Sequence, residues 1–248
     1  MQQKMSDYRK VCYKMQEINI YQSENQIVRD AIDRIIIQVY TRKREKNHKS
    51  FLITGCSAGC GTTNTAINMS VALANAGWKT VLVDCDIRKG MEYKRLNRQI
   101  SSGLSDYLFG KTKDTIYKTN IEMLDYIPCG NDTQSPVRIL ATKEMEKLDK
   151  ELKENYDFVI YDFPSIEVVP DAEIFIPVVD DVILVAAMNE TTNSQLVNAK
   201  AKIKKEGKYM GVIVNKIEIS EYKHYVRDFD YFRADKLRKL YKHKMKNM

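Results

Sequence analysis

The sequence has no long apolar run, no paired-cysteine motif and few histidines. None of its apolar stretches reaches the roughly 18 residues that a membrane-spanning helix needs. No secretory apolar segment follows the first residues, and we therefore expect a cytoplasmic protein. The five cysteines form no CxxC pair and the three histidines have no metal-ligand spacing to one another, which argues against a disulfide framework and a histidine metal site.

Charge is unevenly distributed along the 248 residues. The formal net charge is +7, and residues 233–248 carry seven Lys or Arg residues and one Asp, a local charge of +6. Such a segment either stays solvated or contacts an acidic partner, a membrane surface or nucleic acid. Length and charge pattern predict a helical N-terminal arm and linker (1–48), one domain (49–220) and a basic, tyrosine-containing C-terminal tail (221–248).

One stretch, residues 51–63, is typical of a phosphate-binding turn. Phe51–Ile53 is a short apolar run, as expected for a buried strand. Gly59 and Gly61 follow in a turn, and from Thr63 the apolar residues recur with helical spacing. A strand, a glycine turn and a helix N-terminus direct backbone N–H groups and the positive end of the helix dipole toward an anion.

The end of this turn departs from the phosphate-loop pattern. That pattern closes with Gly-Lys-Ser/Thr, in which the lysine contacts the β- and γ-phosphates and the hydroxyl contacts magnesium. Here the segment reads Gly61-Thr62-Thr63, so the hydroxyl is kept and the lysine is absent.

Strands and helices are predicted to alternate along the rest of the domain. Strands are expected at 79–86, 123–128, 158–162, 180–187 and 208–215, and helices at 30–40, 103–110, 142–155 and 192–206, with a basic linker at 41–50. This order predicts an α/β fold with a doubly wound, mainly parallel sheet. Ligands of such sheets bind at the carboxyl ends of the strands, where we expect the glycine turn, Asp84, Asp86, Asp162 and Asn215.

Three acids at strand ends are candidates for chemistry. Because alternate residues of a strand point the same way, Asp84 and Asp86 are expected on one side. Two carboxylates beside a phosphate suit Mg²⁺ or the activation of a hydroxyl; alternatively, they cap the following turn. Asp162 ends its strand like the acid that holds magnesium in phosphate-loop proteins.

Four cysteines are expected near the same edge of the sheet. They are Cys56, Cys60, Cys85 and Cys129. One interpretation is a metal or redox site at this edge. The preferred interpretation is that the cysteines are small residues that fill tight positions in the loops.

Several segments resemble, in order, those of the cytoplasmic bacterial tyrosine kinases of capsule and exopolysaccharide synthesis, relatives of the septum-site and partition ATPases. They are Ile53–Thr63 (Walker A), Val81–Lys89 (a second, family-specific Walker motif), Gly103–Leu108, Tyr126–Gly130, Val159–Pro164 (Walker B), Asp171–Phe175 and Val212–Lys216. The resemblance implies a P-loop NTPase fold and a site for ATP or ADP with Mg²⁺.

The resemblance also implies roles for individual residues. The nucleotide would be contacted by Gly59, Cys60, Gly61, Thr62, Thr63, Asn64 and Asn215, and magnesium by Thr63, Asp86 and Asp162. The catalytic carboxylates would be Asp84, Asp86 and Asp162, with Asp84 as the base for a tyrosine hydroxyl. The phosphoacceptor candidates are Tyr222, Tyr225, Tyr231 and Tyr241. For Tyr231, which lies beside Phe229 and Phe232, the alternative is packing on the body of the protein.

The family's partners lead to further expectations. Members pair with a membrane-embedded chain-length regulator that activates them, so we expect such a partner at the inner face of the plasma membrane, and no nucleic acid. Members also form rings through an N-terminal helix. That helix aligns with Asp30–Ile36, where both of the family's arginines are replaced, so a homo-oligomer is a weaker expectation.

Three functions remain open from the sequence. The favoured one is a degenerate homologue, a weak or inactive protein-tyrosine kinase that regulates polysaccharide assembly or export. The second is a working autokinase in which another lysine, such as Lys89 or Lys143, replaces the missing one. The third is a partition-type ATPase-like scaffold whose basic tail contacts a membrane or nucleic acid.

Overall fold

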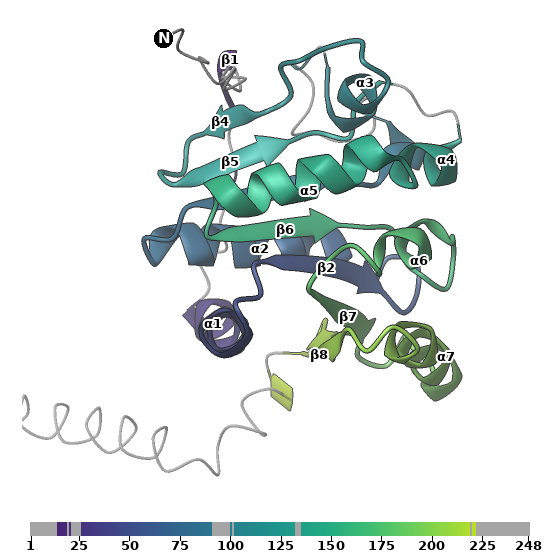
Figure 1. Cartoon of the computed structure of the whole chain (residues 1–248). Coiled ribbons are helices and arrows are strands. Elements are labelled where there is room, and N and C mark those ends of the chain that lie inside the picture. Colours follow the sequence, from purple (N-terminus) through teal and green to yellow (C-terminus); the bar gives the residue numbers. More distant parts are fainter. Residues whose placement is uncertain are drawn as a thin grey trace, which may run out of the picture.

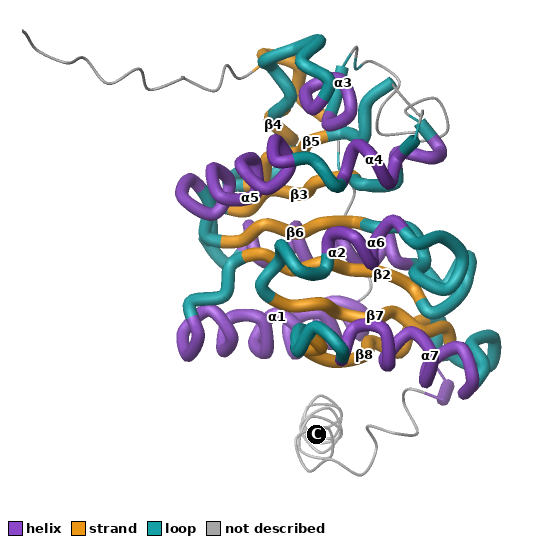
Figure 2. Tube along the Cα trace, turned by 45° about the vertical axis from the view of Figure 1, so that its right-hand side comes forward, coloured by secondary structure: helices purple, strands orange, loops and turns teal. Residues whose placement is uncertain are grey.

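A single mixed sheet forms the centre of the protein. The computed structural model describes residues 14–18, 20, 26–90, 100, 102–131, 135–218 and 220–221. Its strands are β1 (Lys14–Ile18), β2 (Ser50–Gly55), β3 (Thr80–Asp84), β4 (Tyr117–Thr119), β5 (Leu124–Ile127), β6 (Phe158–Asp162), β7 (Asp181–Ala187) and β8 (Tyr209–Asn215). They lie in the order β1-β4-β5-β3-β6-β2-β7-β8, and Figure 2 shows this succession from β4 to β8.

All neighbouring strands from β5 to β8 in this order are parallel, whereas β4 is antiparallel to β5 and β1 is parallel to β4. The helices are α1 (Gln26–Lys46), α2 (Thr62–Asn75), α3 (Leu104–Leu108), α4 (Pro136–Leu140), α5 (Lys143–Asn155), α6 (Asp171–Phe175) and α7 (Asn193–Lys204), with a 3-10 turn, η1, at Ile87–Lys89. In Figure 1, α2 lies behind the sheet beside α1, and α5 and α7 lie in front of it. The predicted doubly wound, mainly parallel α/β fold is confirmed.

The central strands are mostly apolar and buried along their whole length because helices cover both faces. Every residue of β2, β3, β6 and β7 is buried. The last strand, β8, lies at the edge and is only partly covered, with Val212 and Val214 exposed. Within the described part of the chain, no helix is both long enough and apolar enough to cross a membrane.

The helix predicted at residues 30–40 docks on the body as expected, but it is longer than expected. Val39 is fully buried, and the ring of Tyr40 stacks on Trp78 at a centroid distance of 5.0 Å. The expected linker at 41–50 is wrong for its first part, because α1 continues to Lys46. Its last turns are basic, which suits the negative end of the helix dipole.

The elements that the sequence missed are short or irregular. β1, β4, α4 and α6 each have five residues or fewer, too few for a periodic pattern to emerge. The two strands extend the sheet beyond β5. The two helices lie in connections at its carboxyl edge, where the parallel strands end. None of them changes the order of the predicted strands.

The amino edge of the sheet, where the parallel strands begin, is held together by an ion pair and by hydrogen bonds to carboxylates. Lys43 Nζ lies 2.6 Å from Asp157 Oδ1, and His48 Nδ1 lies 2.7 Å from Asp181 Oδ2. The carboxylate of Asp180 accepts hydrogen bonds from two backbone N–H groups at the start of β2. These contacts attach α1 to the first residues of β6 and β7.

Candidate functional site

The glycine turn links β2 to α2 as predicted. Gly59 and Gly61 have φ angles of +71° and +93°, which residues with a Cβ rarely adopt. Gly61 is the N-cap of α2 and offers no side-chain acceptor, and the first turn of the helix contains no acid. The start of this 14-residue helix therefore suits an anion such as phosphate.

The base of the turn is fixed by its neighbours in the sheet. The Cys56 N–H donates to the carbonyl of Val185 in β7 at 2.8 Å. The carbonyl of Gly55 accepts from Ser165 Oγ at 2.7 Å and from the Ile166 N–H at 3.1 Å. Strand β7 and the segment that follows β6 thus position the turn.

Asn215 at the end of β8 reaches the same turn. Its Nδ2 donates to the carbonyl of Cys60 at 3.0 Å. A Cβ added to Gly61 would collide with this amide, so the glycine permits the close approach. The structure places the Asn215 side chain beside the turn. Its contact with a nucleotide stays a prediction.

A neutral side chain occupies the position of the missing lysine. Thr62 Oγ1 lies 3.3 Å from Cys60 Sγ, and Thr62 and Thr63 are half-buried. Asn64, one residue further, is exposed. The turn therefore offers hydroxyl groups and backbone N–H groups at the start of α2, and no ammonium group from this position.

The three predicted carboxylates lie together at the carboxyl edge. Asp84 and Asp162 are register partners on the neighbouring strands β3 and β6, and Asp84, Asp86 and Asp162 are all buried. Asp84 Oδ1 accepts from the Asp86 N–H at 3.0 Å, and Tyr126 OH donates to Asp84 Oδ2 at 3.3 Å. Asp84 therefore does cap the following turn, which was the structural alternative, while it lies beside the other two acids.

Sequence reasoning missed an ion pair that joins two of the resembling segments. Arg88, in η1, donates from Nε and Nη2 to the two carboxylate oxygens of Asp171 at the start of α6, both at 2.7 Å. Asp171 is fully buried, and its hydrogen bond and charge raise the pKa of Arg88 further. The pair ties the loop after β3 to the loop after β6. Arg88 belongs to the resembling segment Val81–Lys89, but no local pattern indicated its partner 83 residues away.

Lys89 and Lys143, the two candidates for a replacement lysine, differ in their surroundings. Lys89 Nζ lies 2.9 Å from Asp86 Oδ2, at the carboxylate cluster, although its side chain is 65% exposed. Lys143 is the exposed first residue of α5. Of the two, Lys89 is the one that the structure places against a predicted site residue.

The oxygen donors of this edge fit a magnesium ion that also binds phosphate. The described residues contain no cluster of three or more His, Cys, Asp or Glu side chains arranged to hold a metal alone. Mg²⁺ usually takes one or two carboxylates together with phosphate oxygens and water. The Thr63 hydroxyl and the buried Asp162 carboxylate are donors of the required type, so a metal carried in with a nucleotide is compatible with the site.

The four cysteines of this edge are all buried. Burial, with smaller contributions from Cys60 and Glu167, raises the pKa of Cys56 to about 12, so its thiol stays protonated at neutral pH. The fifth cysteine, Cys12, lies outside the described residues, as do the phosphoacceptor candidates Tyr222, Tyr225, Tyr231 and Tyr241.

Comparison with known proteins identifies relatives. A family model described as an AAA domain matches residues 48–219. The chain is 31% identical to the putative tyrosine-protein kinase CapB of Staphylococcus aureus, over 71% of this chain and 79% of CapB. It is 34% identical to the tyrosine-protein kinase CpsD of Streptococcus pneumoniae, over 69% of this chain and 78% of CpsD. Among solved structures, the chimerical protein CapA2B2 superposes with a TM-score of 0.71 at 28% identity, over 78% of this chain and 86% of that one.

Proposed function

The chain belongs to the AAA-domain family that includes the tyrosine-protein kinases CapB and CpsD, and we propose that it is a degenerate member of it. In this proposal it binds ATP or ADP with Mg²⁺ weakly and has little or no protein-tyrosine kinase activity. Its role is to regulate the assembly or export of a capsular or extracellular polysaccharide.

The observation that carries the proposal is Thr62. Replacing a phosphate-loop lysine by threonine removes a charge-assisted hydrogen bond to phosphate, worth about 1.5–3 kcal/mol. Loss of a comparable transition-state donor costs about 10²–10³ in rate. The start of α2 and the oxygen donors of Thr63 and Asp162 remain. Binding is therefore weakened less than catalysis.

The remaining residues have definite roles in this proposal. The backbone N–H groups at the start of α2 hold phosphate, and Thr63, Asp86 and Asp162 hold the metal. Mg²⁺, when bound, neutralises charge on the phosphates. Asp84 accepts a proton from a tyrosine hydroxyl in any residual transfer, and Asn215 contacts the adenine.

A protein partner follows from the same family membership. The proposed partner is a membrane-embedded regulator of polysaccharide chain length, which would bring this chain to the inner face of the plasma membrane. The charge of +6 on residues 233–248 favours an anionic surface near that partner.

One observation favours the alternative of an active kinase. Lys89 is an exposed lysine already held at the carboxylate cluster, with its ammonium 2.9 Å from Asp86. A swing of this side chain toward bound phosphate would restore part of the missing charge.

Calorimetric titration with ADP and ATP, with and without Mg²⁺, tests the proposal. We expect weak, magnesium-dependent binding by the natural protein and binding at least tenfold tighter by Thr62→Lys. Asn198→Lys is the matched control, because it adds the same charge at an exposed position in α7, on a different helix. Thr62→Val separates the gain of lysine from the loss of the hydroxyl.

Incubation with Mg-ATP, followed by intact-mass measurement, tests the proposed lack of protein-tyrosine kinase activity. We expect no phosphorylated tyrosine in the natural protein. Phosphorylation at a rate similar to that of Thr62→Lys, abolished by Lys89→Ala, would overturn the degenerate assignment in favour of the active kinase.

A further inference from the structure

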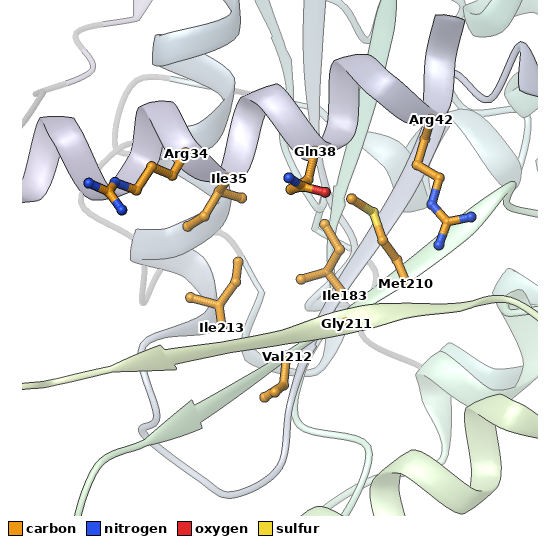
Figure 3. A pocket seen from close by; sticks show the side chains of 9 residues that line it. All are labelled: Arg34, Ile35, Gln38, Arg42, Ile183, Met210, Gly211, Val212 and Ile213. Atoms are coloured by element: carbon orange, nitrogen blue, oxygen red, sulfur yellow. The ribbon is translucent and has the colours of Figure 1, made fainter. Parts of the chain in front are cut away.

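A groove lies between α1 and the edge of the sheet, away from the carboxyl-edge site. It has a volume of about 230 Å³, and Figure 3 shows α1 on one side and β8 on the other. The apolar side chains of Ile35, Ile183 and Ile213 point into it. The groove is thus bounded by a helix and an edge strand that is only partly covered.

A glycine leaves the middle of the groove open. Gly211 lies inside β8, and a Cβ added to it would meet no atom within 4 Å. Glycine weakens a strand, and in a strand interior it often marks a place where a ligand or another backbone approaches closely. The open space above Gly211 has room for a side chain from elsewhere.

Two arginines stand at the ends of the groove. Arg34 and Arg42 flank Gln38 on the groove side of α1 (Figure 3). They are eight residues apart, which is about 12 Å along a helix axis. Arg42 Nε lies 3.8 Å from Asp181 Oδ2, a distance that leaves it only loosely held. An apolar floor between two guanidinium groups suits an aromatic side chain flanked by carboxylates.

The sequence of the chain itself contains such a segment. Residues 228–232 read Asp-Phe-Asp-Tyr-Phe, with an acid on each side of Phe229. They lie outside the described residues, between Glu221 and the basic residues 233–248. The two acids balance the charges of the nearby Lys223 and Arg227. Arg34 and Arg42 therefore do not repel this segment, whereas they would repel the basic residues 233–248.

The chain is long enough to bring this segment to the groove. Asp228 is seven residues beyond Glu221, and an extended chain of that length spans about 23–25 Å. From Asn215, at the end of β8, back to Met210 in the groove is about 17 Å along a strand.

We propose that the groove between α1 and β8 holds residues 228–232 of the same chain. Phe229 lies over Gly211, and Asp228 and Asp230 pair with Arg34 and Arg42. This docking fixes where the basic residues 233–248 begin. It requires neither a nucleotide nor kinase activity, so it stands or falls separately from the proposed function.

Limited chymotryptic cleavage of the full chain, with mass identification of the cut sites, tests the docking. We expect cleavage after Phe229, Tyr231 and Phe232 to be at least tenfold faster in Gly211→Leu than in the natural protein. Gly211 does not have a positive φ, and the new side chain meets open space, so the fold should tolerate the change. Val214→Leu, at an exposed position of the same strand that does not line the groove, is the matched control and should leave the rate unchanged.

A charge exchange tests the pairing. Asp228→Lys with Asp230→Lys should speed cleavage, and adding Arg34→Glu with Arg42→Glu should restore protection. Equal cleavage rates in the natural protein and Gly211→Leu would overturn the proposal. Protection that disappears on dilution would also overturn it, because a second copy of the chain would then occupy the groove.

Discussion

The two ends of the parallel strands use charge in different ways. At the amino edge, Asp157 and Asp181 pair with Lys43 and His48, which come from α1 and its connection to β2, more than 100 residues away in sequence. At the carboxyl edge, Asp84 accepts a hydrogen bond from the backbone N–H of Asp86, and Asp86 pairs with Lys89, all within a few residues. The first edge attaches a helix to the sheet, whereas the second concentrates acids next to a helix N-terminus.

This comparison separates contacts that stabilise the fold from the candidate site. Charges that are matched across distant segments hold the fold together. Charges that are gathered by local sequence at strand ends lie in the candidate site, in the position where parallel sheets bind ligands. Arg88 and Asp171 are the exception at the carboxyl edge, because they join distant segments there.

The largest expected effect comes from breaking the ion pair between Arg88 and Asp171. Arg88→Ala leaves the fully buried Asp171 carboxylate without its fork of hydrogen bonds. We expect the free energy of unfolding in urea to fall by about 3 kcal/mol, the lower end for a broken buried pair, because the Arg88 side chain is 39% exposed. In the double variant with Asp171→Asn the loss should be clearly less than the sum of the single losses. Additive losses would contradict the importance of the pair.

A smaller effect separates the two glycines of the turn. Gly59→Ala and Gly61→Ala both force a Cβ into a left-handed conformation, at a cost of about 1–2 kcal/mol. Only at Gly61 must the new Cβ also displace the Asn215 amide, since nothing lies within 4 Å at Gly59. We expect Gly61→Ala to be about 1 kcal/mol less stable than Gly59→Ala in urea unfolding. Equal values would mean that Asn215 moves aside freely.

Acid should weaken the amino edge through Asp180. Burial alone would raise the pKa of Asp180, but backbone N–H groups of Lys49 and Ser50 and the ammonium of Lys153 outweigh it, so the pKa is lowered. A lowered folded-state pKa gives stability that is present above the unfolded value of about 4 and is lost as the pH falls through the folded value.

The check is urea unfolding of the natural protein and Asp180→Asn between pH 7 and pH 3. The stability difference between them should shrink below about pH 4. Asp149 acts in the opposite sense, because burial raises its pKa, and it is present in both proteins. A difference that stays constant with pH would contradict the assignment to Asp180.

The smallest effect is expected for an ion pair on the surface. Lys216 Nζ lies 2.7 Å from Glu190 Oε2, but both side chains are substantially exposed, at 40% and 53%. Lys216→Ala should change the free energy of unfolding by no more than about 0.5 kcal/mol. A loss comparable to that of Arg88→Ala would show that solvent exposure does not determine how much an ion pair of this protein contributes to stability.

Local pattern was enough to predict most of the strands and the carboxyl edge. Apolar runs that end in Gly or Asp predicted β2, β3 and β6 because parallel strands are buried on both faces and end at loops. The order of these elements along the chain, with the glycine turn, also predicted that Asp84 and Asp162 would end at one edge. Short pieces such as β4 were missed because three residues carry no period.

Only the tertiary structure decided which distant residues meet. The strand order β3-β6-β2-β7-β8 differs from the order in sequence, and it brings Arg88 to Asp171 and Asn215 to Cys60, 155 residues apart. The groove above Gly211 likewise depends on α1 crossing a strand from the far end of the domain. The sequence by itself determined most of the longer elements and which residue types stand at their ends, because these depend on neighbouring residues. The pairing of those ends depends on how strands from different parts of the chain pack, which no local pattern encodes.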